Sequence, residues 1–332
     1  AKRLRAPHGV SKVSDELSAR RSLARTAAQE HHRPTTSEIA QVGVISPSVI
    51  RTRSQAVDAL AVLPAPSDFE RHVLRSTPIE EIWRWVNPLM LYSRHLGLRG
   101  ASVRKLIASS VGDLDARSEV KIADPRGLKV FEAVEEVKTE FKKTPMLRPT
   151  AVFQFFRATS NGQSILIDHP GRPEFQFPRQ DRAEGLCLSD YVSATKPDSI
   201  ALFVVTVGHG VREASKALRD RGEYLKSHIL QSLAVESAEA YAELIHSQLR
   251  SAWGFPDAPT TTMLERFQAR YRGKRYSFGY PACPRLEDQR ILFDLLNPSE
   301  INVELTEGFM MDPEASVSAI AFHHPQASYF SV

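Results

Sequence analysis

The sequence of 332 residues predicts an α+β protein in which helices flank a bent antiparallel sheet. Helical patterns and short apolar strands occur in separate runs, without the regular strand, helix, strand alternation of a parallel sheet. Turn signals at Asn161-Gly162 and Pro170-Gly171 separate neighbouring strands, as in an antiparallel meander. These observations favour the α+β class over a doubly wound nucleotide-binding fold.

Residues 1–75 are predicted to form a basic helical arm and a proline-rich linker, ahead of a domain over residues 76–332. Residues 1–33 contain eight lysines and arginines and three acids, a local net charge of +5. Residues 14–29 have a helix-compatible pattern with Ser14 as the N-cap, and residues 33–68 carry four prolines. A basic arm can bind nucleic acid, but this one has no aromatic residue and no recognised DNA-binding motif. We therefore favour a solvated linker and expect no nucleic-acid partner.

Two helices are predicted between the linker and the first strand of the sheet. The first follows Thr77-Pro78, has acids in its first turn, and directs these apolar residues towards a core: Ile82, Trp83, Val86, Leu89 and Met90. The second covers residues 128–142, where apolar residues recur at spacings of three and four: Val130, Val134, Val137 and Phe141.

The rest of the chain is predicted to alternate groups of strands with a long helical region. The expected strands are residues 151–156, 164–167, 173–177, 199–207, 301–309 and 317–322. The helical region covers residues 212–250 and is broken near Gly222.

One segment, Val204 to Ala214, superficially matches a dinucleotide-binding turn. An apolar strand enters Gly208-x-Gly210 and a helix follows, but Glu213 occupies the position of the third glycine. A carboxylate there would meet the pyrophosphate of the ligand. We therefore interpret the segment as a tight turn from strand to helix, and the fold as not of the Rossmann type.

Composition limits the class of protein. Apolar residues make up 42% of the chain and charged residues 25%, as in globular proteins, and the sequence has no apolar run of the roughly 20 residues that a membrane span requires. The basic N-terminus lacks the apolar segment of a secretory signal. We therefore expect a cytoplasmic protein without a membrane partner.

We expect no metal site and no disulfide. Cys187 and Cys283 lie far apart in sequence without a C-x-x-C motif, and Cys283 is interpreted as a small residue in a tight loop. His323 and His324 are adjacent, so that on a strand their side chains point to opposite faces. The sequence near them does not complete a tetrahedral ligand set.

The segment from Arg275 to Pro284 is the strongest functional signal in the sequence. Its sequence, R-Y-S-F-G-Y-P-A-C-P, combines an arginine, a glycine, aromatic rings and two prolines, which predicts a rigid loop. The guanidinium of Arg275 suits a carboxylate, and the ring of Tyr280 suits a purine, a sulfonium or a flat macrocycle. The loop therefore predicts a pocket for an amphipathic, carboxylate-bearing small molecule; a buried structural loop with a surface salt bridge is the alternative.

Three segments in one order carry a family resemblance. R-x-x-x-G-Y-P-A-C-P at residues 275–284 is followed by L-T-E-G-F-M-M-D-P-E-A-S-V-S at 305–318 and by F-H-H-P-Q-A-S-Y-F at 322–330. Together they resemble the C-terminal activation domain of cobalamin-dependent methionine synthase. Residues 153–162, 177–191 and 239–246 extend the similarity, which runs from about Ser76 to the last residue.

The resemblance implies a site for S-adenosylmethionine, formed by Glu239, Arg275, Ser277, Gly279, Tyr280, Ala282 and Tyr329. In this interpretation Arg275 holds the ligand carboxylate, Glu239 its cationic or ribose groups, and the backbone of the loop its adenine. Glu239, Glu243, His246 and Arg250 occupy one face of a predicted helix, so an ion-pair ladder is the alternative for this group. Glu243 and His246 match the family pattern as supporting residues.

The resemblance also implies a face that covers cobalamin carried by a partner domain. This face is expected to be an exposed apolar rim. Its members are Tyr280, Met310, Glu314, Ala315 and Ser316. Reduced cobalt is the nucleophile in this family, so no catalytic residue is expected, and a flavodoxin-like or flavoprotein reductase supplies the electron. Many members of this family carry an acidic residue near the first helix. The matching position in this chain is Arg84 or Trp85, depending on where one gap is placed.

The function that follows from the resemblance is reactivation of a cobalamin-dependent methionine synthase. The domain would bind S-adenosylmethionine and present its methyl group to reduced cobalamin, which is the reductive-methylation half-reaction of a methyltransferase in methionine biosynthesis. The alternative is a non-catalytic docking or regulatory module for a cobalamin-binding partner.

Overall fold

The computed structural model describes residues 53–110, 114–144 and 148–332. The basic arm at residues 1–33, with its predicted helix at residues 14–29, lies outside these ranges. The described end of the predicted linker is joined to the domain by hydrogen bonds. Arg53 Nη2 donates to the carbonyl of Asp190 at 2.9 Å, and Gln154 Nε2 donates to the carbonyl of Phe69 at 2.9 Å. The domain boundary at residue 75 stays a prediction.

A helical segment precedes most of the sheet. Its elements are β1 (His72–Leu74), α2 (Ile79–Trp83), the π-helix η1 (Leu89–His95), α3 (Gly100–Ser110), α4 (Leu114–Ala123) and α5 (Pro125–Lys142). The side chain of Asp124 caps α5 by accepting from the Gly127 N–H at 2.9 Å. Val134, Val137 and Phe141 of α5 are buried, as their spacing predicts.

The helix predicted from Thr77 onward is interrupted, which corrects one expectation. α2 ends at Trp83, and Pro88 disfavours a helical conformation at Asn87 before it. The Asn87 side chain accepts a hydrogen bond from the Leu89 N–H at 3.1 Å at the start of η1. Ile82 is fully buried as predicted, but Leu89 is 41% exposed and does not face the core.

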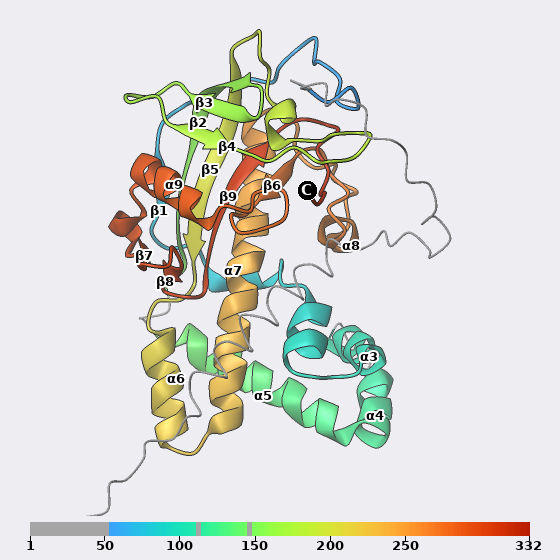
Figure 1. Cartoon of the computed structure of the whole chain (residues 1–332). Helices are drawn as coiled ribbons and strands as arrows, with labels where there is room; N and C mark the ends of the chain where they lie inside the picture. The colour runs from blue at the N-terminus through green and yellow to red at the C-terminus, as the bar shows by residue number, and fades with distance from the viewer. Residues whose placement is uncertain (1–52, 111–113, 145–147) are drawn as a thin grey trace, which may run out of the picture. The chain divides into compact units, whose positions relative to one another are not determined.

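The sheet confirms the predicted fold class. Its main strands are β2 (Thr150–Asn161), β3 (Ser164–Ile167), β4 (Glu174–Gln176), β5 (Asp198–Thr206), β6 (Lys274–Tyr276) and β9 (Ser316–Phe322). They lie in the order β4-β3-β2-β5-β9-β6, with β1 also paired to β2, and every pairing is antiparallel (Figure 1). Helices flank this sheet, so the α+β class is confirmed and a doubly wound fold is excluded.

The remaining elements connect and cover the sheet. They are η2 (Leu188–Tyr191), α6 (Val211–Asp220), α7 (Tyr224–Ala252), α8 (Met263–Phe267), η3 (Leu286–Asp288), α9 (Gln289–Leu296), η4 (Pro298–Ile301), β7 (Glu304–Leu305) and β8 (Met311–Asp312). The predicted break near Gly222 is confirmed by the gap between α6 and α7.

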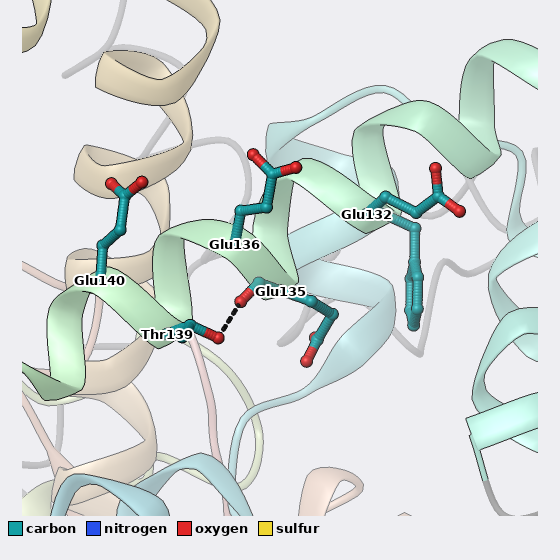
Figure 2. Close-up of a pocket in the computed structure, with 6 residues that line it drawn as sticks. Glu132, Glu135, Glu136, Thr139 and Glu140 are labelled. Carbon is teal, nitrogen blue, oxygen red and sulfur yellow. Dashed lines mark hydrogen bonds between the residues drawn. The ribbon is translucent and has the colours of Figure 1, made fainter.

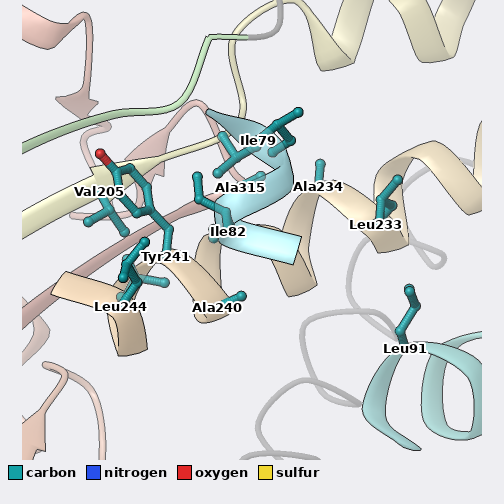
Figure 3. Packing of buried hydrophobic residues seen from close by; sticks show 14 of the residues in the cluster. Ile79, Ile82, Leu91, Val205, Leu233, Ala234, Ala240, Tyr241, Leu244 and Ala315 are labelled. Atoms are coloured by element: carbon teal, nitrogen blue, oxygen red, sulfur yellow. The ribbon is translucent and has the colours of Figure 1, made fainter. Parts of the chain in front are cut away.

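Two cores lie on opposite faces of the sheet because successive strand residues alternate. Phe203 of β5 packs with α2, α5 and α7 in the first core, whereas Leu202 and Val204 pack with α9 in the second. Figure 3 shows Ile79 and Ile82 of α2 among the first-core residues beside α7. α7 also extends beyond the sheet to pack against α5 and α6 (Figure 1).

Two strand predictions near the C-terminus need correction. Residues 301–309 were expected to form one strand, but only Glu304–Leu305 is extended, and it pairs with Met311–Asp312. Phe309 has a φ of +59°, and its N–H donates to the carbonyl of Thr306 at 2.9 Å, so the chain turns there. The segment predicted to be loop from Arg275 begins instead within β6.

The turn after β5 explains the Gly208-x-Gly210 pattern without a nucleotide. A Cβ on Gly208 would lie 2.6 Å from Cβ of Pro313 and 2.9 Å from its Cγ. The adjacent Val207 N–H donates to the carbonyl of Ala315 at 2.9 Å. Gly208 is therefore required for close approach between this turn and the segment that precedes β9, as the interpretation of a tight turn predicts.

Replacement of Gly208 with alanine should destabilise the domain by about 1–3 kcal/mol, because the new methyl group overlaps the Pro313 ring. Urea denaturation measures this free energy of unfolding. Gly308→Ala is the matched control, because a Cβ at Gly308 meets no atom within 4 Å. Equal stabilities of the two variants would contradict the proposed close approach.

Candidate functional site

Strand β6 directs Arg275 towards helix α7. Arg275 pairs with Ala321 of β9, and Tyr276 pairs with Ile320. Tyr276 and Ile320 belong to the second core, so the preceding side chain, Arg275, points to the opposite face, where α7 lies. The alternation of β6 therefore places the guanidinium against α7.

Helix α7 brings two carboxylates to Arg275, as its helical spacing predicts. Arg275 Nη2 donates to Glu239 Oε2 at 3.5 Å, and Arg275 Nε lies 3.5 Å from Glu243 Oε2. Within the described residues the Arg275 side chain donates a hydrogen bond only through Nη2, and neither Nη1 nor the buried Nε has a hydrogen-bond partner. We call Glu239, Glu243, Arg275, Tyr271 and Tyr329 the arginine site.

The electrostatics of the arginine site keep Arg275 charged and Tyr329 neutral. Burial works to lower the pKa of Arg275, but the nearby carboxylates of Glu239 and Glu243 raise it overall. Burial raises the pKa of Tyr329 to about 12, although the positive charge of Arg275 opposes that shift. The site therefore presents a permanent cation beside a neutral phenol, which suits a ligand that carries both a carboxylate and an aromatic group.

His246 lies behind this site, one helical turn beyond Glu243. Its side chain is fully buried, its ring meets Tyr271 edge-on with centroids 5.4 Å apart, and neither ring nitrogen has a hydrogen-bond partner among the described residues. Burial, together with the charges of Arg250 and Arg275, lowers its pKa well below 6.5. His246 is therefore a neutral imidazole in the folded protein.

The loop after β6 is closed by its own backbone. The Gly279 N–H donates to the carbonyl of Cys283 at 2.8 Å, and the Cys283 N–H donates to the carbonyl of Tyr280 at 2.8 Å. Gly279 has a φ of +84°, a left-handed conformation that favours glycine. Ala282 and Cys283 are buried in the second core, which agrees with the interpretation of Cys283 as a small packing residue.

Of the sequence-predicted ligand residues, the structure brings Arg275 of β6 and Glu239 of α7 into contact. Ser277, Gly279, Tyr280 and Ala282 continue the chain directly from Arg275. At the C-terminus, Tyr329 packs edge-on against Tyr276 with ring centroids 5.5 Å apart.

The exposure expected for the cobalamin-facing rim is wrong at two of its residues, while the role of the rim stays a prediction. Met310 is 51% exposed and Glu314 is also exposed, but Ala315 and Ser316 are each only 6% exposed. Ser316 Oγ donates to the Pro313 carbonyl at 2.6 Å and lies 2.8 Å from Thr206 Oγ1, so its side chain turns inward. Figure 3 shows Ala315 within the first core. A macrocycle could therefore meet only the backbone of these two residues.

A separate groove of about 610 Å³ lies beside α5 and contains none of the predicted site residues (Figure 2). It is lined by Phe131, Glu132, Glu135, Glu136, Thr139 and Glu140. Lys226 lies 3.3 Å from Glu136 and 3.2 Å from Glu140, and Lys138 lies 2.8 Å from Glu135. This groove is acidic and unsuited to a carboxylate ligand, so the arginine site remains the better candidate.

The paired histidines follow the end of β9 at Phe322 and have different structural partners. His323 Nε2 lies 2.6 Å from Asp198 Oδ1, and its ring packs edge-on against Trp253. His324 Nε2 lies 3.1 Å from the carbonyl of Asp58. In the part of the chain that the structure describes, no group of three or more His, Cys, Asp or Glu side chains is placed to hold a metal ion. Nor is any described helix long and apolar enough to span a membrane.

Tyr271 and Asp257 are not among the residues predicted from the sequence. Tyr271 donates its hydroxyl hydrogen bond to Glu243 Oε2 at 3.1 Å. Asp257 accepts from Arg250 Nε at 2.7 Å and from Arg266 Nε at 3.0 Å. Both residues come from the irregular segment between α7 and β6, where a sequence has no periodicity that reveals which side chains turn inward.

The neutral state of His246 predicts a loss of stability in acid. Below pH 6.5 the unfolded chain binds a proton at this histidine and the folded protein does not. The free energy of unfolding therefore decreases as the pH is lowered, by up to about 1.4 kcal/mol per pH unit. His246→Leu should remove this contribution, and urea denaturation at pH 7.5, 6.5 and 5.5 measures it. His228→Leu, at an exposed position of α7, is the control. Parallel pH profiles of parent and His246→Leu would refute the assignment.

Known proteins resemble this chain in sequence and in fold. Residues 115–332 match the family described as "Vitamin B12 dependent methionine synthase, activation domain". Methionine synthase of Mycobacterium tuberculosis (strain ATCC 25618 / H37Rv) is 34% identical over 210 residues, which cover 54% of this chain and 17% of that protein. Methionine synthase of Mycobacterium leprae (strain TN) is 26% identical over 359 residues, which cover 98% of this chain and 27% of that protein.

A solved structure has the same fold. The crystal structure of the MetH reactivation domain bound to AdoHcy matches with a TM-score of 0.69 and 24% identity, covering 81% of this chain and 83% of that one. The chain thus spans at most about a quarter of the two methionine synthases. Since the family match covers more than half of its residues, this chain belongs to the family of vitamin B12-dependent methionine synthase activation domains.

Proposed function

We propose that this domain binds S-adenosylmethionine and presents its methyl group to reduced cobalamin held by a separate domain. The observation that carries the proposal is the arginine site. A charged Arg275, held beside Glu239 and Glu243, adjoins the loop that the family resemblance assigns to the ligand. The family membership supports the same role, because its description is that of an activation domain.

The chemistry of the ligand matches the charges of the site. Its carboxylate can bind Nη1 of Arg275, which donates no hydrogen bond within the described residues. Glu239, whose side chain is 27% exposed, can accept from the ammonium or ribose groups. The backbone of Ser277 and Ala282 would hold the adenine, and Tyr280 would lie between the ligand and the corrin. Tyr329 would pack near the adenosyl group.

The chain's own contribution is positioning and charge. Cobalamin supplies the nucleophile, its reduced cobalt, so neither a protein base nor a protein nucleophile is needed. The electron that reduces cobalamin would come from a flavodoxin-like or other flavoprotein reductase. The residues of the arginine site would hold the sulfonium methyl group at the edge of the domain, where the partner domain can reach it.

A docking module that does not bind S-adenosylmethionine is the second candidate. One observation favours it: the segment where relatives carry an acid holds no carboxylate here. Arg84 is exposed, and Trp85 lies under the guanidinium of Arg266, with 5.1 Å between the Arg266 carbon and the ring centroid. A direct measurement of affinity for S-adenosylmethionine separates the two candidates.

Arg275→Ala should weaken binding of S-adenosylmethionine by about 1.5–3 kcal/mol, the range for a hydrogen bond to a charged group. Isothermal titration calorimetry measures this change. Arg285→Ala provides a matched control, because Arg285 follows the same loop, is 48% exposed, and pairs with Glu287 and Asp288. Unchanged affinity in a folded Arg275→Ala protein would remove Arg275 from the ligand site.

Docking of a cobalamin-loaded partner domain should depend on Met310, the most exposed apolar member of the predicted rim. Met310→Asp should weaken this docking at least severalfold while affinity for S-adenosylmethionine stays near that of the parent. Biolayer interferometry with the separate cobalamin domain measures docking. Leu264→Asp is the control, since Leu264 is 62% exposed on α8, outside the predicted rim. Equal docking of all three proteins would place the cobalamin face elsewhere.

A further inference from the structure

Glu243 has a different environment from Glu239, although both contact Arg275. The Glu243 side chain is only 12% exposed and lies among three groups. Its Oε2 is 3.5 Å from Arg275 Nε and accepts from the Tyr271 hydroxyl at 3.1 Å, and its Oε1 is 3.8 Å from Arg250 Nη2. Glu243 therefore accepts a hydrogen bond from Tyr271 and lies at ion-pair distance from two guanidinium groups, whereas Glu239 is more open to solvent.

Tyr271 is itself held on several sides. The guanidinium carbon of Arg250 lies 3.8 Å from its ring centroid, and His246 meets the ring edge-on. Lys274 Nζ donates to the Tyr271 carbonyl at 2.7 Å and to the Gly273 carbonyl at 2.9 Å. Burial, and then the charge of Glu243, raise the pKa of Tyr271 well above 10, so its hydroxyl remains a donor. This environment holds the hydroxyl towards Glu243.

The orientation of a guanidinium is set when two of its nitrogens are held. It is planar and presents its N–H groups in a rigid fork. Here Glu239 accepts a hydrogen bond from Nη2, and the Glu243 carboxylate forms an ion pair with the Nε edge at 3.5 Å, although the buried Nε itself donates no hydrogen bond within the described residues. The two carboxylates favour one orientation of the plane, and in that orientation Nη1 is the arm that contacts neither of them. A rotation about the guanidinium axis would break the contact with Glu243. The direction of Nη1 therefore depends on the contact that Tyr271 supports.

We propose that Glu243 and Tyr271 are positioning residues that orient Arg275 so that its Nη1 meets the carboxylate of an amino-acid-bearing ligand. The inference rests on the proposed function and deepens it. By this inference, the preference of the site for a ligand with an α-carboxylate over a ligand without one depends on these two residues. Neither residue needs to touch the ligand.

The test compares two ligands that differ only at the carboxylate. Calorimetry gives the affinities of the parent protein, Tyr271→Phe and Glu243→Gln for S-adenosylmethionine and for its decarboxylated analogue. The parent should bind S-adenosylmethionine about tenfold or more tightly than the decarboxylated analogue, because the analogue cannot form the hydrogen bond between its carboxylate and Arg275. Tyr271→Phe should reduce that preference about three- to tenfold, and Glu243→Gln at least as much, while affinity for the decarboxylated analogue stays constant.

Two controls isolate the effect. Tyr241→Phe removes a buried hydroxyl from α7 that contacts Thr77 Oγ1 at 2.6 Å, far in sequence from Arg275, and should keep the parent's preference. In an Arg275→Ala background, Tyr271→Phe should cause no further loss, because its effect passes through Arg275. Thermal unfolding shows whether each variant folds. If Glu243→Gln does not fold, the comparison of the parent with Tyr271→Phe is sufficient for the test.

The outcomes separate this inference from the proposed function. A Tyr271→Phe protein that keeps the full preference, or that loses affinity equally for both ligands, would overturn the positioning role. The positioning role would also be overturned if Tyr271→Phe reduced affinity for S-adenosylmethionine by the same factor in the parent and in the Arg275→Ala background. If the parent binds neither ligand, the proposed function fails and the inference fails with it.

Discussion

Burial of strand β5 on both faces is the constraint on which the rest of this structure depends. All nine of its residues are buried, and it pairs with β2 on one side and β9 on the other. A strand buried in this way needs a cover on each face. α7 supplies the cover on one face and α9 with the loop after β6 supplies it on the other, so the elements that hold the candidate site are those that complete the two cores.

The polar interior of the domain follows from this arrangement. α7 contacts β5 and β9 along the same face that carries Glu243, His246 and Arg250. Buried charges are costly unless they are paired. Opposite charges therefore alternate along a series of ion pairs, in the order Arg266, Asp257, Arg250, Glu243 and Arg275. The candidate site lies at the more exposed end of this series, where Glu239 reaches solvent.

Several features of the site could be predicted from the sequence because they depend on local spacing. Glu239 and Glu243 are one helical turn apart, and the residues after Arg275 form a loop that requires glycine at Gly279. The contact between α7 and β6 could not be derived from such spacing. It was expected only because the segments resemble a family, and the measured distances from Arg275 to both carboxylates agree with that expectation.

Other features escaped prediction because nonlocal contacts decide them. Ala315 and Ser316 follow a proline turn and were expected to be exposed, but hydrogen bonds to Thr206 and Val207 draw them into the core. Leu89 matches a helical pattern, but the helix stops before it reaches that residue. Tyr271 lies in an irregular segment, so only the folded chain shows that it supports Glu243.

By itself, the sequence determined the α+β class, the antiparallel strands, the break between α6 and α7, and the residues that carry charge and aromatic rings to the site. These depend on periodicity and turn chemistry, which act over a few residues. Only the tertiary structure decided which side chains of the turn before β9 are buried and how Arg275 is held. The physical reason is that burial and ion pairing are set by contacts between segments far apart in the chain, which local sequence does not encode.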